Sequence, residues 1–328
     1  MSVTVRIRCL CIALGILLLS GVPGVVRAGE FPERPITAVI AFAPGGAPDL
    51  LFRPMAELAK KHLGVPVVIV NKPGGGGLTG TAEVARAKPD GYTVLMNFGG
   101  GEIVVSPHLE KVPFDPMKDF EPIIMIGHYP SALLVREDSP WKTLEEFIQA
   151  AKKSPGELRY SHTGALGLNN LTTLTFMKLA GITLTPIPTA GGGQAMNMLL
   201  GGHVEAAQIA FPVAWPQVHA KQLRCLAYAL PKRSEVYGDA PTFAEQGFDM
   251  RFTIAQGIAA PKGTPKEVVK KIHDAFAAAY HDKSITEVMT TIRFTPHYLN
   301  SEDFTKYIRE MYDYYGSVIA KLGITATK

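Results

Sequence analysis

Short apolar runs alternate with helix-like segments along most of this 328-residue chain, and the alternation limits the folds open to it. Helix start signals separate the runs, such as Thr143 with Glu146 three residues later. Strand–helix alternation predicts an α/β fold, with a parallel or mostly parallel sheet and helices on both faces. The predicted strands are 36–42, 65–70, 92–97, 121–126, 132–135, 158–161, 182–188, 206–211, 223–230 and 251–259. The predicted helices are 50–63, 78–87, 141–153, 167–181, 194–201, 266–281, 284–291 and 301–322.

The length allows two domains, each with its own core, but no low-complexity linker divides the chain. Short crossings must then connect the domains, and residues 127–130 are the best candidate for the first, with a second near 231–252. We therefore expect a discontinuous domain 1 (29–128 plus 248–328) and a domain 2 (129–247). The ligand would lie in the cleft between them, where the carboxyl ends of the strands face each other.

The N-terminus has the features of an export signal. Arg6 and Arg8 precede an apolar run at 10–20, and Val26-Arg27-Ala28 is a small-x-small cleavage pattern. The run is short for a transmembrane helix. We expect cleavage after Ala28 and an exported protein, with a retained N-terminal anchor as the alternative. Without residues 1–28, which carry three Arg and no acidic residue, the balance is 30 basic to 29 acidic residues. No basic block suggests nucleic acid.

Cysteine and histidine give no sign of a metal site. After removal of residues 1–28 the chain keeps Cys225 alone, in an apolar run, so we expect a buried core residue and no intramolecular disulfide. No Cys/His cluster has the spacing of a zinc site, and no H-E-x-x-H is present.

The stretch Ala41–Asp49, Ala-Phe-Ala-Pro-Gly-Gly-Ala-Pro-Asp, joins the first predicted strand to the first predicted helix. A strand that ends in Pro-Gly-Gly and turns into a helix exposes backbone N–H groups at the helix N-terminus. These donors and the positive end of the helix dipole attract anions. The loop is therefore a candidate half-site for an anionic ligand; a strand–helix turn without a ligand is the alternative.

The segment Gly75-Gly-Gly-Leu-Thr-Gly80 satisfies the G-x-G-x-x-G pattern of dinucleotide-binding folds. In those folds the pattern follows the first strand, whereas here it follows the second, and an exported protein has little access to NAD. We instead expect a wide turn whose backbone only glycine tolerates. No cofactor is expected.

The segment Ser161-His162-Thr163-Gly164 lies between a predicted strand and a predicted helix. It offers hydroxyls, an imidazole and N–H groups at a second helix N-terminus, and is the natural partner of the first loop. An exported hydrolase with Ser161 as nucleophile and His162 as base is an enzyme alternative. Adjacent residues seldom reach each other in that geometry, however, and the chain has no G-x-S-x-G elbow. A plain hydrogen-bonded loop is the third possibility.

Two more predicted strands end in glycine-containing loops, Asn97-Phe98-Gly99-Gly100 and Thr189-Ala190-Gly191-Gly192. Phe98, Phe211 and Trp215 stand at strand ends, where they either face a ligand or pack in the core. Several glycine-containing loops at strand ends, with few ionisable side chains, indicate a cleft that binds its ligand through backbone groups. We therefore expect a binding protein without catalytic residues.

In this order, a series of short segments closely resembles the Bug-type substrate-binding proteins of tripartite tricarboxylate transporters, from about Phe31 to Ile324. The matching segments are Phe31-Pro-x-Arg-Pro-Ile36, Pro44-Gly-Gly-x-x-Asp49 with Arg53, Asn71-x-Pro-Gly-x-Gly-Gly77 with Gly80, Ala87-x-Pro-Asp-Gly-Tyr-Thr93, Phe114-Asp-Pro-x-Lys-Asp-Phe120, Leu199-x-Gly-Gly-His-Val-Glu205, Pro241-Thr-x-x-Glu-Gln-Gly247 and Ala260-Pro-x-Gly-Thr-Pro265.

The resemblance implies a two-domain fold of the periplasmic-binding-protein type, with two sheets flanked by helices and no catalysis. It implies a monomeric periplasmic receptor for a small organic carboxylate, with the membrane subunits of such a transporter as partners. A ligand-sensing subunit for a signalling protein is the alternative within this fold. Asp49 is expected to orient its loop, because a carboxylate would repel an anionic ligand. The expected ligand-binding positions are Phe42, Pro44, Gly45, Gly46, Asp49, Asn97, Phe98, Ser161, His162, Thr163, Gly164, Ala190, Gly191 and Phe211.

The second loop departs from the family pattern, so the family's usual ligand cannot be carried over. His162 stands where serine is usual, Leu166 replaces the second glycine, and Asn170-Leu171 stands in place of His-Leu. His162 can be cationic below about pH 6.5 and add charge complementarity to a carboxylate. Pro54 inside the first helix should kink or shorten it.

Overall fold

The computed structural model of the protein describes residues 31–164 and 167–325. Contacts divide the chain into two parts, Met1–Glu33 and Arg34–Lys328. Only 31–33 of the first part are described, so the fold below is that of the second. The predicted export signal and its cleavage site lie outside the described residues, as does Leu166. Within the described ranges, no helix is both long and apolar enough to span a membrane.

Six strands build the first half of the sheet. The strands β1, β2 and β3 pair in parallel in the order β2-β1-β3, and the antiparallel strands β9, β4 and β10 continue from β3. Their bounds are β1 Ile36–Ile40, β2 Val67–Asn71, β3 Thr93–Phe98, β4 Phe120–Arg136, β9 Thr253–Pro261 and β10 Thr295–Leu299. The helices of this half are α2 Ala47–Leu63, the 3₁₀ turn η1 Gly75–Gly77, α3 Leu78–Ala85, α4 Gly101–Val104, α5 Ser106–Leu109, α10 Lys266–Tyr280, α11 Lys283–Thr291 and α12 Ser301–Leu322.

The second half repeats the strand–helix alternation. The strand β5 pairs in parallel with β6 and β7, while β7 and β8 both pair antiparallel with the end of β4. The strands are β5 Arg159–Thr163, β6 Thr185–Thr189, β7 Ala206–Ala210 and β8 Leu223–Tyr228. The helices are α6 Leu144–Lys153, α7 Leu168–Ala180, α8 Gly192–Leu200 and α9 Phe211–His219, with 3₁₀ turns η2 Glu235–Tyr237 and η3 Ala244–Gln246.

The strand β4 belongs to both halves. It pairs with β9 from Phe120 to Pro130 and with β7 from Ser131 to Leu134. The sequence predicted two strands here, broken at 127–130, and that break is wrong. Two register shifts, between Pro122 and Ile124 and between Met125 and Gly127, absorb the irregularity, so the backbone stays extended through Gly127 and Pro130.

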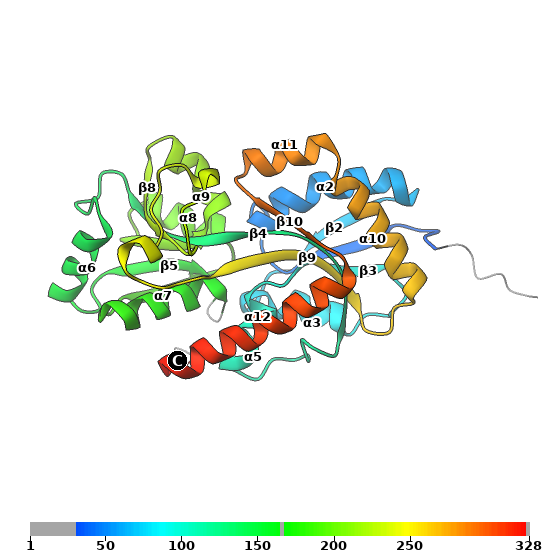
Figure 1. Ribbon diagram of the computed structural model, residues 1–328, viewed down its shortest axis with the longest axis horizontal. Helices are drawn as coiled ribbons and strands as arrows, with labels where there is room; N and C mark the ends of the chain where they lie inside the picture. The colour runs from blue at the N-terminus through cyan, green and yellow to red at the C-terminus, as the bar shows by residue number, and fades with distance from the viewer. Residues whose placement is uncertain (1–30, 165–166, 326–328) are drawn as a thin grey trace, which may run out of the picture. The chain divides into compact units, whose positions relative to one another are not determined.

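Helices cover both faces of each half, as the α/β prediction requires. In Figure 1, α2, α10 and α11 lie on one side of the first half, and α3 and α12 lie on the other. In the second half, α8 and α9 lie on the side opposite α7. The α/β class is therefore confirmed, with a sheet that is mixed rather than mostly parallel. The division into domains at 129 and 247 stays a prediction.

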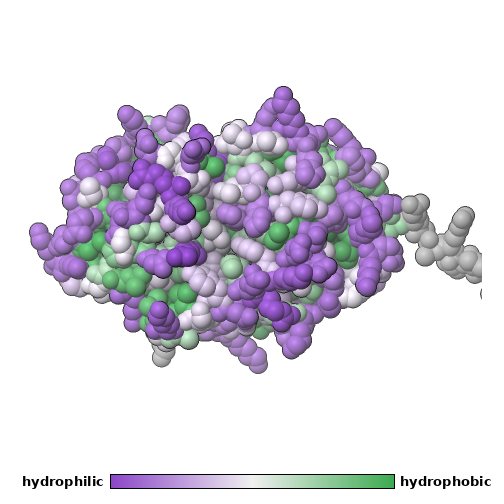
Figure 2. Space-filling view, viewed as in Figure 1, coloured by the Kyte–Doolittle hydropathy of each residue, from purple (hydrophilic) through white to green (hydrophobic). Residues whose placement is uncertain are grey.

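The core is apolar on both sides of the sheet, and hydrophilic side chains dominate the face seen in Figure 2. Cys225 is buried and unpaired, as expected, and burial raises the pKa of its thiol. Thr143 and Glu146 form the predicted capping box at the start of α6.

Some elements differ from the prediction. The sequence missed α9, whose first turn carries Pro212 and which follows β7 without a loop. It also missed β10, which has a proline and pairs with β4 at few positions. Pro54 does not end α2, which continues to Leu63.

Candidate functional site

The loop between β1 and α2 is held in shape by one carboxylate. Asp49 accepts hydrogen bonds from the Gly45 N–H (3.0 Å), from Arg53 (2.9 Å) and from the Asn71 amide (3.1 Å). Burial opposes ionisation of Asp49, but these hydrogen bonds and the Arg53 charge outweigh it and lower the pKa. Asp49 thus orients the loop, as expected, and its oxygens face partners within the protein.

Three helices begin at glycines beside one cavity. The N-caps of α2, α7 and α8 are Gly46, Gly167 and Gly191, and none provides a side-chain hydrogen bond to its helix. By contrast, side chains cap α6, α11 and α12. Because the first N–H groups of a helix have no acceptor within it, the uncapped ends can donate to an external anion.

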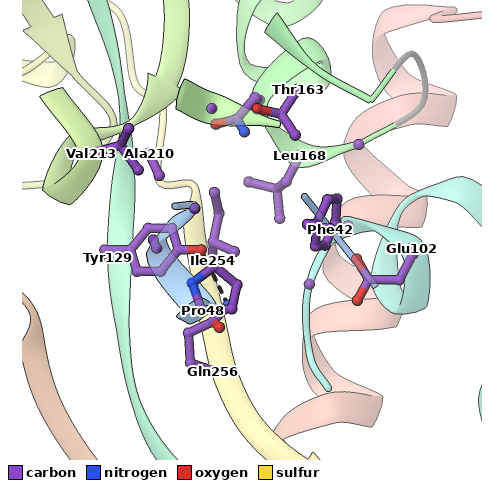
Figure 3. A pocket seen from close by; sticks show the side chains of 17 residues that line it. Phe42, Pro48, Glu102, Tyr129, Thr163, Leu168, Ala210, Val213, Ile254 and Gln256 are labelled. Atoms are coloured by element: carbon purple, nitrogen blue, oxygen red, sulfur yellow. Dashed lines mark hydrogen bonds between the residues drawn. The ribbon is translucent and has the colours of Figure 1, made fainter. Parts of the chain in front are cut away.

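The cavity between these helix ends has a volume of about 50 Å³, room for a few water molecules. Figure 3 shows side chains from both halves of the sheet pointing toward it. Among the described residues that line it there is no Lys, Arg or His, so backbone dipoles are its positive groups. The lining residues are Phe42, Gly46, Ala47, Pro48, Gly100, Gly101, Glu102, Tyr129, Thr163, Gly167, Leu168, Asn169, Gly192, Ala210, Val213, Ile254 and Gln256.

A second, more open cavity of about 550 Å³ also has Phe42 in its lining. The turn Gly74–Gly77 forms one side, with Gly164, Ala190 and Glu110 among the other lining residues. All four glycines of the turn have positive φ, which confirms that only glycine suits this backbone.

Loops from the two halves touch at glycines. A Cβ added to Gly164 would lie 2.8 Å from the Gly76 Cα, and one added to Gly191 would lie 3.1 Å from the Ala43 Cβ. A Cβ on Gly101 would come 2.9 Å from the Gly167 Cα. The first predicted half-site therefore meets the Gly191 loop, and the second meets the turn 74–77.

Ser161 and His162 lie behind the cavity. The Ser161 hydroxyl is buried and donates to the Ala195 carbonyl (2.8 Å), with no base bonded to it. His162 Nδ1 is 3.1 Å from the Gly164 carbonyl oxygen. Burial lowers the pKa of His162 to about 4, so the expected cation near pH 6.5 is wrong. Strand alternation places Thr163 on the face opposite His162, and Thr163 lines the cavity.

The predicted aromatic residues pack in the core. Phe98 lies against Phe120 and Phe304, and Phe211 stacks on Tyr237. Neither lines the two cavities above, whereas Ala210 and Val213 beside Phe211 do. Among the other predicted positions, Gly46, Thr163 and Phe42 line the first cavity, and Phe42, Gly164 and Ala190 line the second. Pro44, Gly45, Asp49 and Gly191 support the loops instead.

Asn97 forms a hydrogen bond to the carboxyl of Glu102, a residue that the sequence did not point to. Its amide donates to Glu102 Oε1 (2.6 Å) and accepts from the Ala41 N–H (2.8 Å). Glu102 is fully buried, and its Oε2 makes no hydrogen bond to any described residue. Burial raises the pKa of Glu102 to about 7, against hydrogen bonds from its own backbone N–H and from Asn97. The predicted glycine-bearing segment 97–100 includes Asn97 and ends two residues before Glu102.

Polar groups of the central strands line the opposite wall. Gln256 Nε2 lies 3.2 Å from the Tyr129 hydroxyl oxygen, and Gln256 Oε1 has no partner among the described residues. Asn169 Oδ1 accepts from Ser131 (2.6 Å), which leaves the Asn169 amide N–H groups for the cavity. No local motif marks Tyr129 or Gln256, because they lie within β4 and β9 and meet the cavity only in the folded sheet.

The donor set suits an anion more than a metal ion. Backbone N–H groups, the Thr163 hydroxyl and the Asn169 amide can all donate to a carboxylate. Among the described residues, no group of three or more His, Cys, Asp or Glu side chains could hold a metal ion.

Related sequences match almost the whole chain. The family described as "Tripartite tricarboxylate transporter family receptor" matches residues 51–324. A UPF0065 protein of Cupriavidus necator is 36% identical over 313 residues, covering 95% of this chain and 94% of its own. Protein BugT of Bordetella pertussis is 29% identical over 314 residues, covering 94% and 96%.

Solved structures share the fold. The periplasmic binding protein BugD is 31% identical with a TM-score of 0.85, covering 90% of this chain and 99% of its own. A Rhodopseudomonas palustris protein, Rpa4515, solved with adipate, is 28% identical with a TM-score of 0.85 (90% and 99%). MatC of the same organism, with bound malate, is 27% identical with a TM-score of 0.82 (88% and 100%). This chain is a Bug-type member of the tripartite tricarboxylate transporter family of receptors.

Proposed function

We propose that this protein is a periplasmic receptor that binds a small organic carboxylate in the cavity between α2, α7 and α8. The observation that carries the proposal is the convergence of three helix N-termini, each capped by glycine, on one cavity without a cationic side chain. Orphan N–H groups and helix dipoles stabilise a carboxylate there. Two structural neighbours were solved with the carboxylates adipate and malate.

The receptor would deliver its ligand to the membrane subunits of a tripartite tricarboxylate-type transporter, in line with its family. The small cavity and the contacts at Gly164 and Gly191 support a cycle in which the two loops part to admit the ligand and close over it. The proposed ligand contacts are Gly46, Thr163, Gly167, Asn169 and Gly192. The expected monomeric state stays a prediction.

A thermal-shift screen of mono-, di-, hydroxy-, amino- and aromatic carboxylates tests the proposal, because a ligand at a hundred times its Kd adds about 2.7 kcal/mol to stability. At least one carboxylate is expected to raise the melting temperature. No shift with any of them would count against a carboxylate receptor.

The variant Gly46→Val tests the site with the best hit. The backbone at Gly46 has an ordinary φ of −76°, and an added Cβ meets nothing closer than 3.5 Å, so the fold should persist. The β-branched side chain should block approach to the N–H groups of α2 and weaken binding at least about tenfold by calorimetry. Lys60→Val, at an exposed position in the last turn of α2, is the control and should bind normally. Unchanged affinity in Gly46→Val would place the ligand elsewhere.

A further inference from the structure

Glu102 is the buried ionisable group whose position is hardest to explain without a ligand. It is 0% exposed, lines the cavity and turns its carboxyl toward Phe42 (Figure 3). Oε1 is fixed by the Asn97 amide at 2.6 Å, whereas Oε2 has no partner among the described residues. A buried polar atom left unpaired costs free energy, about 1–3 kcal/mol for a neutral group and more for a charged one. The ligand itself is the natural partner of Oε2.

The groups around Glu102 determine whether its carboxyl is neutral or ionised when the ligand binds. The positive ends of α2, α7 and α8 face the same cavity and disfavour a ligand cation beside Glu102. No Lys, Arg or His among the described lining residues neutralises an ionised carboxylate. Burial therefore favours the neutral acid, whose Oε2–H is a donor.

We propose that Glu102 sets the ligand specificity of the receptor by binding as the neutral acid and donating its Oε2–H to a second oxygen acceptor of the ligand. The ligand class is then a dicarboxylate or hydroxycarboxylate: one carboxylate lies at the helix ends, and the second carboxylate or hydroxyl oxygen lies at Glu102. The inference rests on the proposed function and adds a residue that sets specificity and a proton that binds with the ligand. Because ionised Glu102 has no proton to donate, binding above neutral pH takes up one proton.

The other titratable groups around Glu102 come from β4, α2, β5 and the elements packed on α4. On β4, burial raises the pKa of Tyr129, and on α2 the Asp49 carboxylate is paired with Arg53. On β5, the pKa of His162 is about 4. The elements packed on α4 add two groups. His108 of α5 has a lowered pKa through burial, with Asp313 of α12 nearby. The pKa of Glu102, about 7, falls inside the range 6.5–8.5.

The test uses succinate, malate and adipate as probes, with butyrate and 4-aminobutyrate as four-carbon controls that lack the second carboxylate or replace it with an ammonium group. By calorimetry, at least one dicarboxylate should bind at least about tenfold more tightly than butyrate, which leaves Oε2 unpaired. Its affinity should fall about tenfold or more from pH 6.5 to 8.5. Titration at pH 8 in buffers of different ionisation enthalpy should report proton uptake.

The variant Glu102→Gln keeps the shape and offers an amide donor at every pH. It should bind the same probe with an affinity that no longer changes with pH and without proton uptake. Glu110→Gln is the matched control, because it removes an exposed carboxylate at the second cavity and should keep the wild-type pH dependence.

Three results would overturn the inference. They are tighter binding of butyrate or 4-aminobutyrate than of any dicarboxylate, the same pH profile in Glu102→Gln as in the wild type, and no binding of any of the five probes. The first two leave the carboxylate receptor intact. If none of the five probes binds, the wider carboxylate screen still tests the proposed function. Failure of the inference and failure of the proposed function can therefore be told apart. The proton uptake of the wild type tests the inference independently of the variant.

Discussion

At the scale of single residues, two carboxyl groups of the site have different surroundings and therefore different pKa values. Asp49 accepts three hydrogen bonds and pairs with Arg53, which lowers its pKa, so it stays ionised and holds the loop. At Glu102, no Lys, Arg or His lies among the described cavity-lining residues, and burial outweighs the hydrogen bonds to the carboxyl and raises its pKa. The two groups therefore take different roles, one as an anchor and the other as a group that can carry a proton.

The raised pKa of Glu102 predicts a pH-dependent stability. The unfolded-state pKa is near 4.5 and the folded-state pKa near 7, so the neutral form supports the fold below pH 4.5 and that support is lost as the pH rises through about 7. At pH 8, Glu102→Gln should be more stable than the wild type by up to about 3 kcal/mol, and the two should converge toward pH 5. Urea denaturation at both pH values measures this. Equal stability at pH 8 would contradict a buried, unpaired carboxyl.

At the scale of elements, the helices around the cavity differ from α6, α11 and α12 in how their first N–H groups are satisfied. A side chain satisfies the first N–H groups of α6, α11 and α12, whose starts lie away from the cavity. The helices α2, α7 and α8 begin at glycines in the site. Because a capping side chain competes with a ligand for the same N–H groups, its absence suits a binding role.

Removal of the cap of α6 should affect stability alone. Thr143→Ala deletes the hydroxyl that accepts from the Glu146 N–H (3.2 Å), at an expected cost of about 1 kcal/mol in the free energy of unfolding. Ligand affinity should not change, since α6 does not line the cavity. Gly46→Val gives the opposite pattern, with binding lost and the fold kept. Denaturation and calorimetry on both variants check the contrast, and a loss of affinity in Thr143→Ala would contradict it.

At the scale of the whole molecule from Arg34 onward, β4 and β9 link the two halves, and the loops of the halves meet over the cavity. Tyr129 and Gln256 lie on these shared strands and line the cavity. The same strands that connect the halves thus also contact the proposed ligand, and relative motion of the halves about them would change the cavity.

A wedge between the loops should favour the open form. The φ of Gly191 is −171°, which any residue adopts, but its Cβ would lie 3.1 Å from that of Ala43. Gly191→Val should therefore fold, with stability within about 1 kcal/mol of the wild type, and should bind at least about tenfold more weakly because dissociation is faster. Stopped-flow and calorimetry would measure this, with the exposed Lys60→Val of α2 as control. An unchanged dissociation rate would show that the contact plays no part in closure.

Local patterns alone determined the α/β class, the capping box of α6, the glycine turn at 74–77, the burial of Cys225 and the role of Asp49. Each depends on residues close in the sequence, or on the burial expected of an apolar run. Only the tertiary structure decided which residues line the cavity. Strand alternation turned Thr163 toward it and His162 away, and packing placed Phe98 and Phe211 in the core. Glu102, Tyr129 and Gln256 come from three separate elements, and the fold brings them to one cavity; the contact between Gln256 and Tyr129 joins residues far apart in the sequence.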